Sequence, residues 1–113
     1  MADGDGLHVE RIETASDPRL ADYRDIGEAE LRRRHGLFIA ESRSVVRRLL
    51  EAGRFRTRSI LLTETALDGL RDALAARAPH GPLYVAPHEV IRAVTGFDFH
   101  RGCLAIGERG APL

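Results

Sequence analysis

Short apolar runs alternate with longer amphipathic segments along this chain, and this alternation restricts its fold more than any other feature. The runs at 37–40, 59–62, 83–85 and 103–106 are almost wholly apolar, and an alternating stretch at 7–12 precedes them. Continuous apolar runs of this kind are typical of strands covered on both faces. Strands that alternate with helices of about 10–15 residues indicate βαβ units. We therefore predict an α/β protein, a small three-layer α/β/α sandwich with about four core strands that are mostly parallel.

The segments between these runs carry start and stop signals of helices. Asp17 and Pro18 fit the N-cap and first position of a helix that extends to Arg34. The other three predicted helices are capped by Ser42, by Thr63 or Thr65, and by Pro87, and they end at Gly53, Pro79 and Gly96.

Size and composition fit one domain. The chain has 113 residues, enough for a single core, and because Trp is absent this core must be aliphatic. We divide the chain into a disordered tail at 1–6, a folded domain at 7–109 and the start of a linker at 110–113. The single cysteine excludes an internal disulfide, the tail lacks the pattern of a signal peptide, and no run of 18 apolar residues occurs. These features predict a cytoplasmic protein without a membrane span.

No motif for self-sufficient catalysis is present. No two of the five histidines have the spacing of metal ligands on a helix. These histidines are His8, His35, His80, His88 and His100. Cys103 lies in an apolar run and is predicted to be a small core residue, while a nucleophilic role beside His100 stays an open alternative.

The net charge is zero, but the charges are unevenly distributed. Residues 1–30 carry nine acids and three arginines, whereas residues 31–58 carry nine arginines and two acids. Three arginine groups make up this excess, namely Arg32, Arg33 and Arg34; Arg43, Arg47 and Arg48; and Arg54, Arg56 and Arg58. Together they could form a stripe along a phosphate backbone. The alternatives are solvated helix faces, pairing of Arg47 with Glu51, and favourable placement at a helix C-terminus.

The segment 97–102 contains two aromatics, an imidazole, a guanidinium and a glycine. Unpaired RNA bases are recognised by stacking on such groups. The alternative is that Phe97 or Phe99 completes the core beneath the sheet.

Two blocks of the sequence resemble a known family. Residues 36–42, with Phe38 and Glu41, resemble the "F-hydrophobic-x-E-G" block of the substrate-binding domain of SpoU/TrmH RNA ribose 2′-O-methyltransferases. Residues 94–105 resemble its "T-G…H-R-G-x-L-A" block, and residues 17–23 are similar to the family's lead-in helix. The resemblance covers roughly residues 9–109. Ser42 departs from it, because the family usually has glycine there, and the stretch 32–36 is shorter than in many members.

The resemblance implies a fold like that of kink-turn-binding ribosomal proteins and binding to structured rRNA or tRNA. It also implies a following knotted catalytic domain that binds S-adenosylmethionine and dimerises. The motifs of that domain do not occur here, so we expect no catalysis by this chain alone. The segment 7–109 would then be the substrate-binding domain and 110–113 the start of the linker. The candidate RNA-binding residues are Arg32, Arg33, Arg34, Glu41, Arg43, Arg47, Arg48, Phe99, His100, Arg101 and Gly102.

Two other functions stay open. The chain could be a stand-alone kink-turn-binding protein, or a protein-interaction module that uses the weakly charged helix predicted at 64–78.

Overall fold

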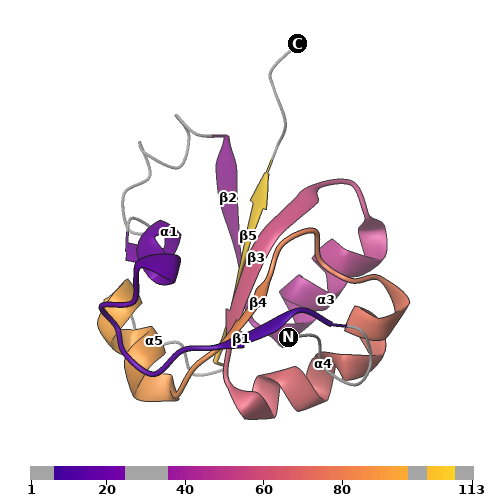
Figure 1. The fold of residues 1–113 in the computed structure, drawn as a ribbon. Helices are drawn as coiled ribbons and strands as arrows, with labels where there is room; N and C mark the ends of the chain where they lie inside the picture. Colours follow the sequence, from indigo (N-terminus) through magenta and orange to yellow (C-terminus); the bar gives the residue numbers. More distant parts are fainter. Residues whose placement is uncertain (1–6, 25–35, 97–101, 109–113) are drawn as a thin grey trace.

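A five-stranded sheet lies between two layers of helices in the computed structural model, which describes residues 7–24, 36–96 and 102–108 (Figure 1). The strands are β1 (Val9–Arg11), β2 (Leu37–Glu41), β3 (Arg56–Leu62), β4 (Leu83–Val85) and β5 (Cys103–Glu108). The helices are α1 (Ala21–Arg24), α3 (Arg43–Ala52), α4 (Glu64–Ala76) and α5 (His88–Thr95), and a 3-10 turn, Pro18–Leu20, leads into α1. The α/β prediction is confirmed, and every predicted strand segment contains a strand. The predicted tail at 1–6 and linker at 110–113 lie outside the described residues.

The order of strands across the sheet is β1-β4-β3-β5-β2. The pairs β1–β4 and β4–β3 are parallel, whereas β5 is antiparallel to both β3 and β2. Four strands therefore run in one direction and β5 runs in the other, so the sheet is mixed. The reason is that α5 has only eight residues and does not carry the chain back along the sheet. Cys103 instead pairs with Leu62, at the end of β3, and β5 returns from there.

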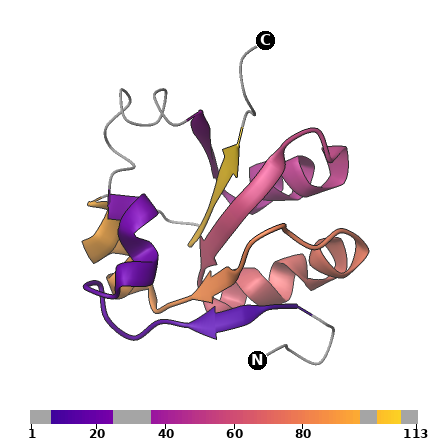
Figure 2. The ribbon, with the colours of Figure 1, turned by 45° about the horizontal axis from the view of Figure 1, so that its top comes forward.

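Aliphatic side chains fill the space on both faces of the sheet, as the lack of Trp predicts. The helices α3 and α4 cover one face, where Ile60 and Leu62 of β3 are fully buried. The 3-10 turn, α1 and α5 cover the other face above Leu61 (Figure 2). Burying a leucine or isoleucine side chain contributes about 1.5–3 kcal/mol, so both layers stabilise the fold. This arrangement is the predicted three-layer sandwich.

Polar caps and glycines define the ends of the helices as predicted. The Thr63 hydroxyl, and not that of Thr65, accepts a hydrogen bond from the Ala66 amide at 3.2 Å. Gly53 and Gly96 end α3 and α5 in the left-handed conformation, with φ of 64° and 75°. Residues other than glycine are disfavoured in this left-handed conformation.

The segment before β2 was predicted to be one helix from Asp17 to Arg34. In its described part, it forms a 3-10 turn followed by the short helix α1. Asp17 caps the 3-10 turn by accepting a hydrogen bond from the Arg19 amide at 2.9 Å. Buried Tyr23 then fixes α1 to the sheet, with its hydroxyl 2.7 Å from the Ser59 hydroxyl. Residues 25–35 lie outside the described part of the chain. None of the described helices has the length and apolar character needed to cross a membrane.

Candidate nucleic-acid interface

The two sequence blocks that resemble the RNA-modifying family come together in the fold. β2, from the first block, pairs with β5, which begins within the second. The Ser42 amide donates to the Cys103 carbonyl at 3.1 Å, and the Thr63 amide donates to the Gly102 carbonyl at 2.9 Å. Ser42, Thr63 and Gly102 therefore meet at one end of the sheet, which we call the Ser42–Gly102 edge.

Gly102 is required at this edge by both its conformation and its surroundings. Its φ is 58°, a value that residues with a side chain rarely adopt. A Cβ at this position would also lie 2.9 Å from Oγ1 and Cγ2 of Thr63. The backbone of β3 and the start of β5 can thus approach each other only because the residue is glycine.

Ser42 is the one non-glycine residue with positive φ among the described residues, at φ 79° and ψ 155°. This region of conformational space is almost exclusive to glycine and costs other residues about 1–3 kcal/mol. The Ser42 hydroxyl partly offsets this cost by capping α3, since it accepts from the Val45 amide at 3.5 Å. The structure thus gives a physical reason for the glycine expected at this position from the family pattern.

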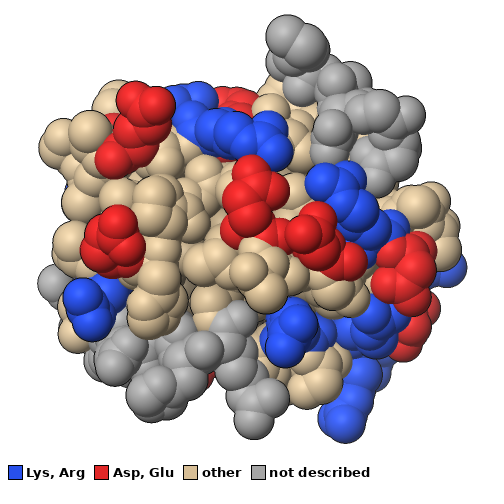
Figure 3. Space-filling view, turned by 90° about the horizontal axis from the view of Figure 1, so that it is seen from below, with Lys and Arg blue, Asp and Glu red and all other residues tan. Residues whose placement is uncertain are grey.

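The start of α3 has a composition that favours an anion. The first turn of α3 contains no acidic residue and begins with exposed Arg43. The free amides and positive dipole end of a helix attract phosphate. The Arg43 side chain extends from this turn toward Gly69 of α4, and its guanidinium adds positive charge and hydrogen-bond donors to the region. Exposed Glu41 is the acidic residue that precedes the cap. Seen from below, this face of the molecule shows acidic and basic side chains interspersed among the described residues (Figure 3).

Arg47 turns toward α4 and not outward. Its guanidinium binds both carboxylate oxygens of Asp72, at 2.9 and 3.1 Å, and donates to the Gly69 carbonyl at 2.8 Å. These bonds hold the pKa of Asp72 below its usual value. The alternative considered from the sequence, pairing with Glu51, is thus replaced by a bond between helices. Arg48 stays exposed on α3 without an ion pair to any described residue.

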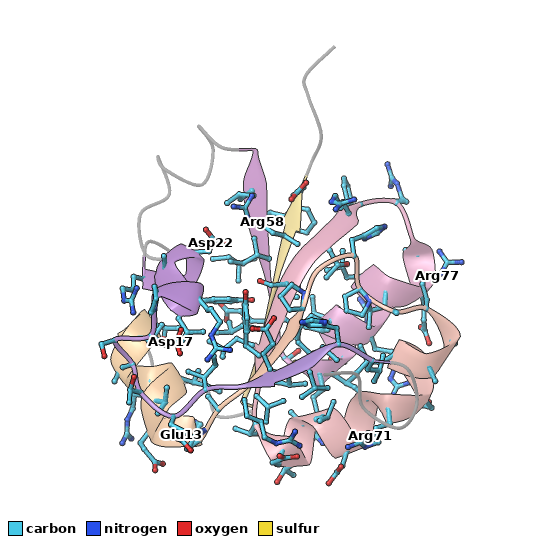
Figure 4. The ribbon with its side chains drawn as sticks, in the orientation of Figure 1. Glu13, Asp17, Asp22, Arg58, Arg71 and Arg77 are labelled. Carbon is cyan, nitrogen blue, oxygen red and sulfur yellow. The ribbon has the colours of Figure 1, made fainter. Side chains whose placement is uncertain are left out.

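The third arginine group is divided by a β-bulge. The pairing of β3 with β5 shifts between Thr57 and Ser59, so that Arg58 and Ser59 both contact α1 although they are consecutive. Arg58 binds Asp22 of α1 at 2.8 Å (Figure 4). Arg47, Arg56 and Arg58, which belong to the predicted stripe, have acidic partners among the described residues. The stripe itself stays a prediction.

The remaining residues predicted to bind RNA or to have a chemical role are partly outside the described structure. Arg32, Arg33, Arg34, Phe99, His100 and Arg101 lie outside the described residues. Cys103 is buried, and burial raises the pKa of its thiol to about 12, which confirms it as a core residue. Among the described residues, no three His, Cys, Asp or Glu side chains gather as metal ligands.

Two features of this region do not follow from the sequence patterns described above. The positive φ of Ser42 could have been inferred only from the family's glycine at that position. The His80 side chain accepts a hydrogen bond from the Thr57 amide, 3.0 Å from Nδ1, and no sequence pattern indicates this long-range contact.

Comparisons with known proteins agree with the predicted resemblance. No protein-family model matches the chain. It is 38% identical over 109 residues to an uncharacterized tRNA/rRNA methyltransferase of Mycobacterium tuberculosis, and equally to one of Mycobacterium bovis. The match covers 93% of this chain but 37% of each relative. The chain thus spans little more than a third of the length of these relatives.

Solved structures share the fold. An rRNA methyltransferase from Sinorhizobium meliloti superposes with a TM-score of 0.69 at 19% identity, over 93% of this chain and 39% of that one. An RNA 2′-O ribose methyltransferase gives 0.68 at 21% identity, over 92% and 39%. A putative TrmH-family RNA methyltransferase from Porphyromonas gingivalis gives 0.55 at 21% identity, over 87% and 37%.

Proposed function

We propose that this chain, a homologue of the N-terminal part of TrmH/SpoU-family rRNA/tRNA methyltransferases, binds structured rRNA or tRNA for a catalytic domain that methylates a ribose 2′-oxygen. The observation that carries the proposal is the Ser42–Gly102 edge. Both family-like blocks supply residues to this edge, and it combines a helix N-terminus with Arg43. Such a combination suits a phosphate group.

The role of the chain would be positioning. Arg43 and the first amides of α3 would hold a phosphate, and glycine at position 102 keeps the neighbouring backbone free of a side chain. Phe99, His100 and Arg101 directly precede Gly102 in the sequence and remain the predicted contacts for unpaired bases. A bound RNA held in this way reacts as if the transfer were intramolecular.

S-adenosylmethionine would bind to the catalytic part of the parent protein and supply the methyl group. One of the structural relatives is an AdoMet-bound rRNA methyltransferase, of which this chain covers 38%. The described residues provide no glycine-rich loop between a strand and a helix, the feature that commonly receives such a nucleoside cofactor. In this proposal the chain contributes RNA binding, and the catalytic part of the parent protein carries out the methyl transfer.

Titration of the chain into a labelled RNA stem-loop with an internal loop, followed by fluorescence anisotropy at two salt concentrations, tests this function. We expect tighter binding to the RNA than to a DNA duplex of equal charge. Replacing Arg43 by Ala should weaken RNA binding, whereas Arg92→Ala, which removes an exposed arginine from α5, should not. Equal and weak binding to both nucleic acids would contradict the proposal.

Arg47 needs a separate test because it is already bound to Asp72. Arg47→Ala should weaken RNA binding, while Asp72→Ala should strengthen it, since the freed guanidinium is no longer neutralised by the carboxylate. Both variants lose the bond between Arg47 and Asp72, and Arg47→Ala also loses the bond to the Gly69 carbonyl, so Arg47→Ala should lose at least as much stability in unfolding experiments. Unchanged RNA binding in both variants would assign Arg47 to the fold alone.

A further inference from the structure

Several arginines lie at the opposite end of the sheet from the Ser42–Gly102 edge. The helices α3 and α4 both end there, because each connects parallel strands. The Arg77 guanidinium lies against Gly53, where an added Cβ would overlap its Nη1 atom. Arg54 follows Gly53, and Arg56 begins β3. In Figure 4, Arg77 projects on the side where α3 ends and β3 begins. We call Arg54, Arg56 and Arg77, together with Phe55, the Arg54 surface.

The positive charge of this surface is little neutralised. Arg54 and Arg77 are exposed and have no ion pair with any described residue. Arg56 is 3.6 Å from Glu108 and its side chain is 61% exposed. By contrast, Arg47 and Arg58 bind carboxylates at 2.9 and 2.8 Å. Cations are also favoured beside the carboxyl ends of helices, and Arg54 and Arg77 lie just beyond the ends of α3 and α4.

Two aromatic rings, Phe38 and Phe55, lie between the Arg54 surface and the core. Phe55 meets Phe38 edge to face, with ring centroids 5.0 Å apart, and both rings pack on the core. The Arg54 guanidinium carbon lies 5.5 Å from the centre of the Phe55 ring, within range of a cation–π contact. Phe38 in turn contacts Gly107 of β5, where any side chain would collide with the ring. The guanidinium of Arg54 is therefore oriented by the fold before any ligand binds.

We propose that the Arg54 surface binds RNA phosphates at a second place, separate from the Ser42–Gly102 edge. This inference rests on the proposed function, because the same RNA would contact both ends of the sheet. Planar guanidinium groups beside an aromatic ring suit phosphates and adjacent bases better than the compact charge of a lysine ammonium would. The two sites would fix the orientation of the RNA, which one site cannot do.

The test compares two triple variants of equal charge. Replacing Arg54, Arg56 and Arg77 by Ala should weaken binding to the labelled stem-loop about tenfold or more, and should reduce the salt slope of binding by about three. The control replaces Arg11, Arg71 and Arg92 by Ala and should change neither value by a comparable amount. Circular dichroism of both variants checks that they are folded.

The outcomes separate this inference from the proposed function. If the Arg54-surface variant binds RNA like the control while Arg43→Ala weakens binding, the second site is overturned and the RNA-binding function stands. If the unmodified chain does not bind the stem-loop, both are overturned. If the Arg54-surface variant loses binding to poly-L-glutamate but not to RNA, the surface recognises an acidic polypeptide, and the RNA assignment is wrong.

Discussion

At the scale of single residues, Ser42 combines a favourable cap with an unfavourable backbone conformation. Its hydroxyl caps α3, but its φ of 79° lies where side chains are poorly tolerated. Exchange of a capping serine for glycine usually costs a few tenths of a kcal/mol. Relief of the backbone strain is worth about 1–3 kcal/mol. The second effect is larger, so the strain determines the outcome of a substitution by glycine.

We therefore expect Ser42→Gly to stabilise the domain by about 1 kcal/mol in urea unfolding. The matched control is Ser44→Gly, two residues further along in α3, where φ is helical and glycine should destabilise by roughly 0.5–1 kcal/mol. Losses of equal size in both variants would show that the backbone at Ser42 is not strained.

At the scale of elements, the bulge in β3 is held by the turn between α4 and β4. The Thr57 amide donates to His80 Nδ1 at 3.0 Å, and the Thr57 carbonyl accepts from the amides of His80 and Gly81, both at 3.1 Å. Thr57 is buried, so an unpaired amide there would not be solvated by water. The bulge in turn directs Arg58 toward α1.

Removing the acceptor on His80 should therefore destabilise the bulge. We expect His80→Leu to lower the free energy of unfolding by about 1–3 kcal/mol, the cost of leaving a buried donor unpaired. His80→Asn places a carbonyl oxygen near the former position of Nδ1 and should retain most of the stability. Equal losses in the two variants would mean that the ring is needed for packing and not for its hydrogen bond.

The 3-10 turn before α1 depends on an ion pair that acid breaks. Asp17 binds Arg19, whose guanidinium also reaches Glu10 of β1 at 2.9 Å. The hydrogen bonds from Arg19 lower the pKa of Asp17 from 3.8 to about 2. A carboxylate with a depressed pKa in the folded state stabilises it above the unfolded pKa, and this contribution disappears as pH falls through the folded pKa.

The contribution of Asp17 should thus be complete above about pH 4 and lost near pH 2. We expect Asp17→Asn to be less stable than the unmodified chain at neutral pH, and the difference to vanish at the acid end. Urea midpoints measured across this range test it, with Glu13→Gln as the control for removal of an exposed acid. A difference that persists at low pH would assign the effect to the cap and not to the charge.

The helices and strands could be predicted where they are encoded by residues close together in the sequence. The caps at Thr63 and Gly53 and the apolar runs are encoded by neighbouring residues, so the helices and strands were predictable. The reversed direction of β5, the bulge at Thr57 and the turning of Arg47 to Asp72 depend on contacts between residues far apart in sequence. The Ser42–Gly102 edge was predictable only because both of its blocks resemble one family.

At the scale of the whole molecule, the two helical layers can be observed separately. Trp is absent, and the two tyrosines, Tyr23 and Tyr84, both belong to the cluster on the α1 and α5 side of the sheet. Tyrosine fluorescence therefore reports mainly on that layer. Of the helices that the structure describes, the longest are α3 and α4 on the other face, and they contribute most to the far-UV circular dichroism of these residues. The sheet joins the layers, since Leu61 of β3 faces one and Ile60 the other.

We expect both signals to give the same urea midpoint, because strands shared by two cores make a small domain unfold as a unit. Tyr23→Phe should lower the midpoint of both equally, by removing the hydroxyl that pairs with buried Ser59, at a cost of about 1–3 kcal/mol. If fluorescence instead changed at a lower urea concentration than circular dichroism, the α1 and α5 layer would unfold independently. The Ser42–Gly102 edge, to which β2, β3 and β5 lead, would then rest mainly on α3 and α4.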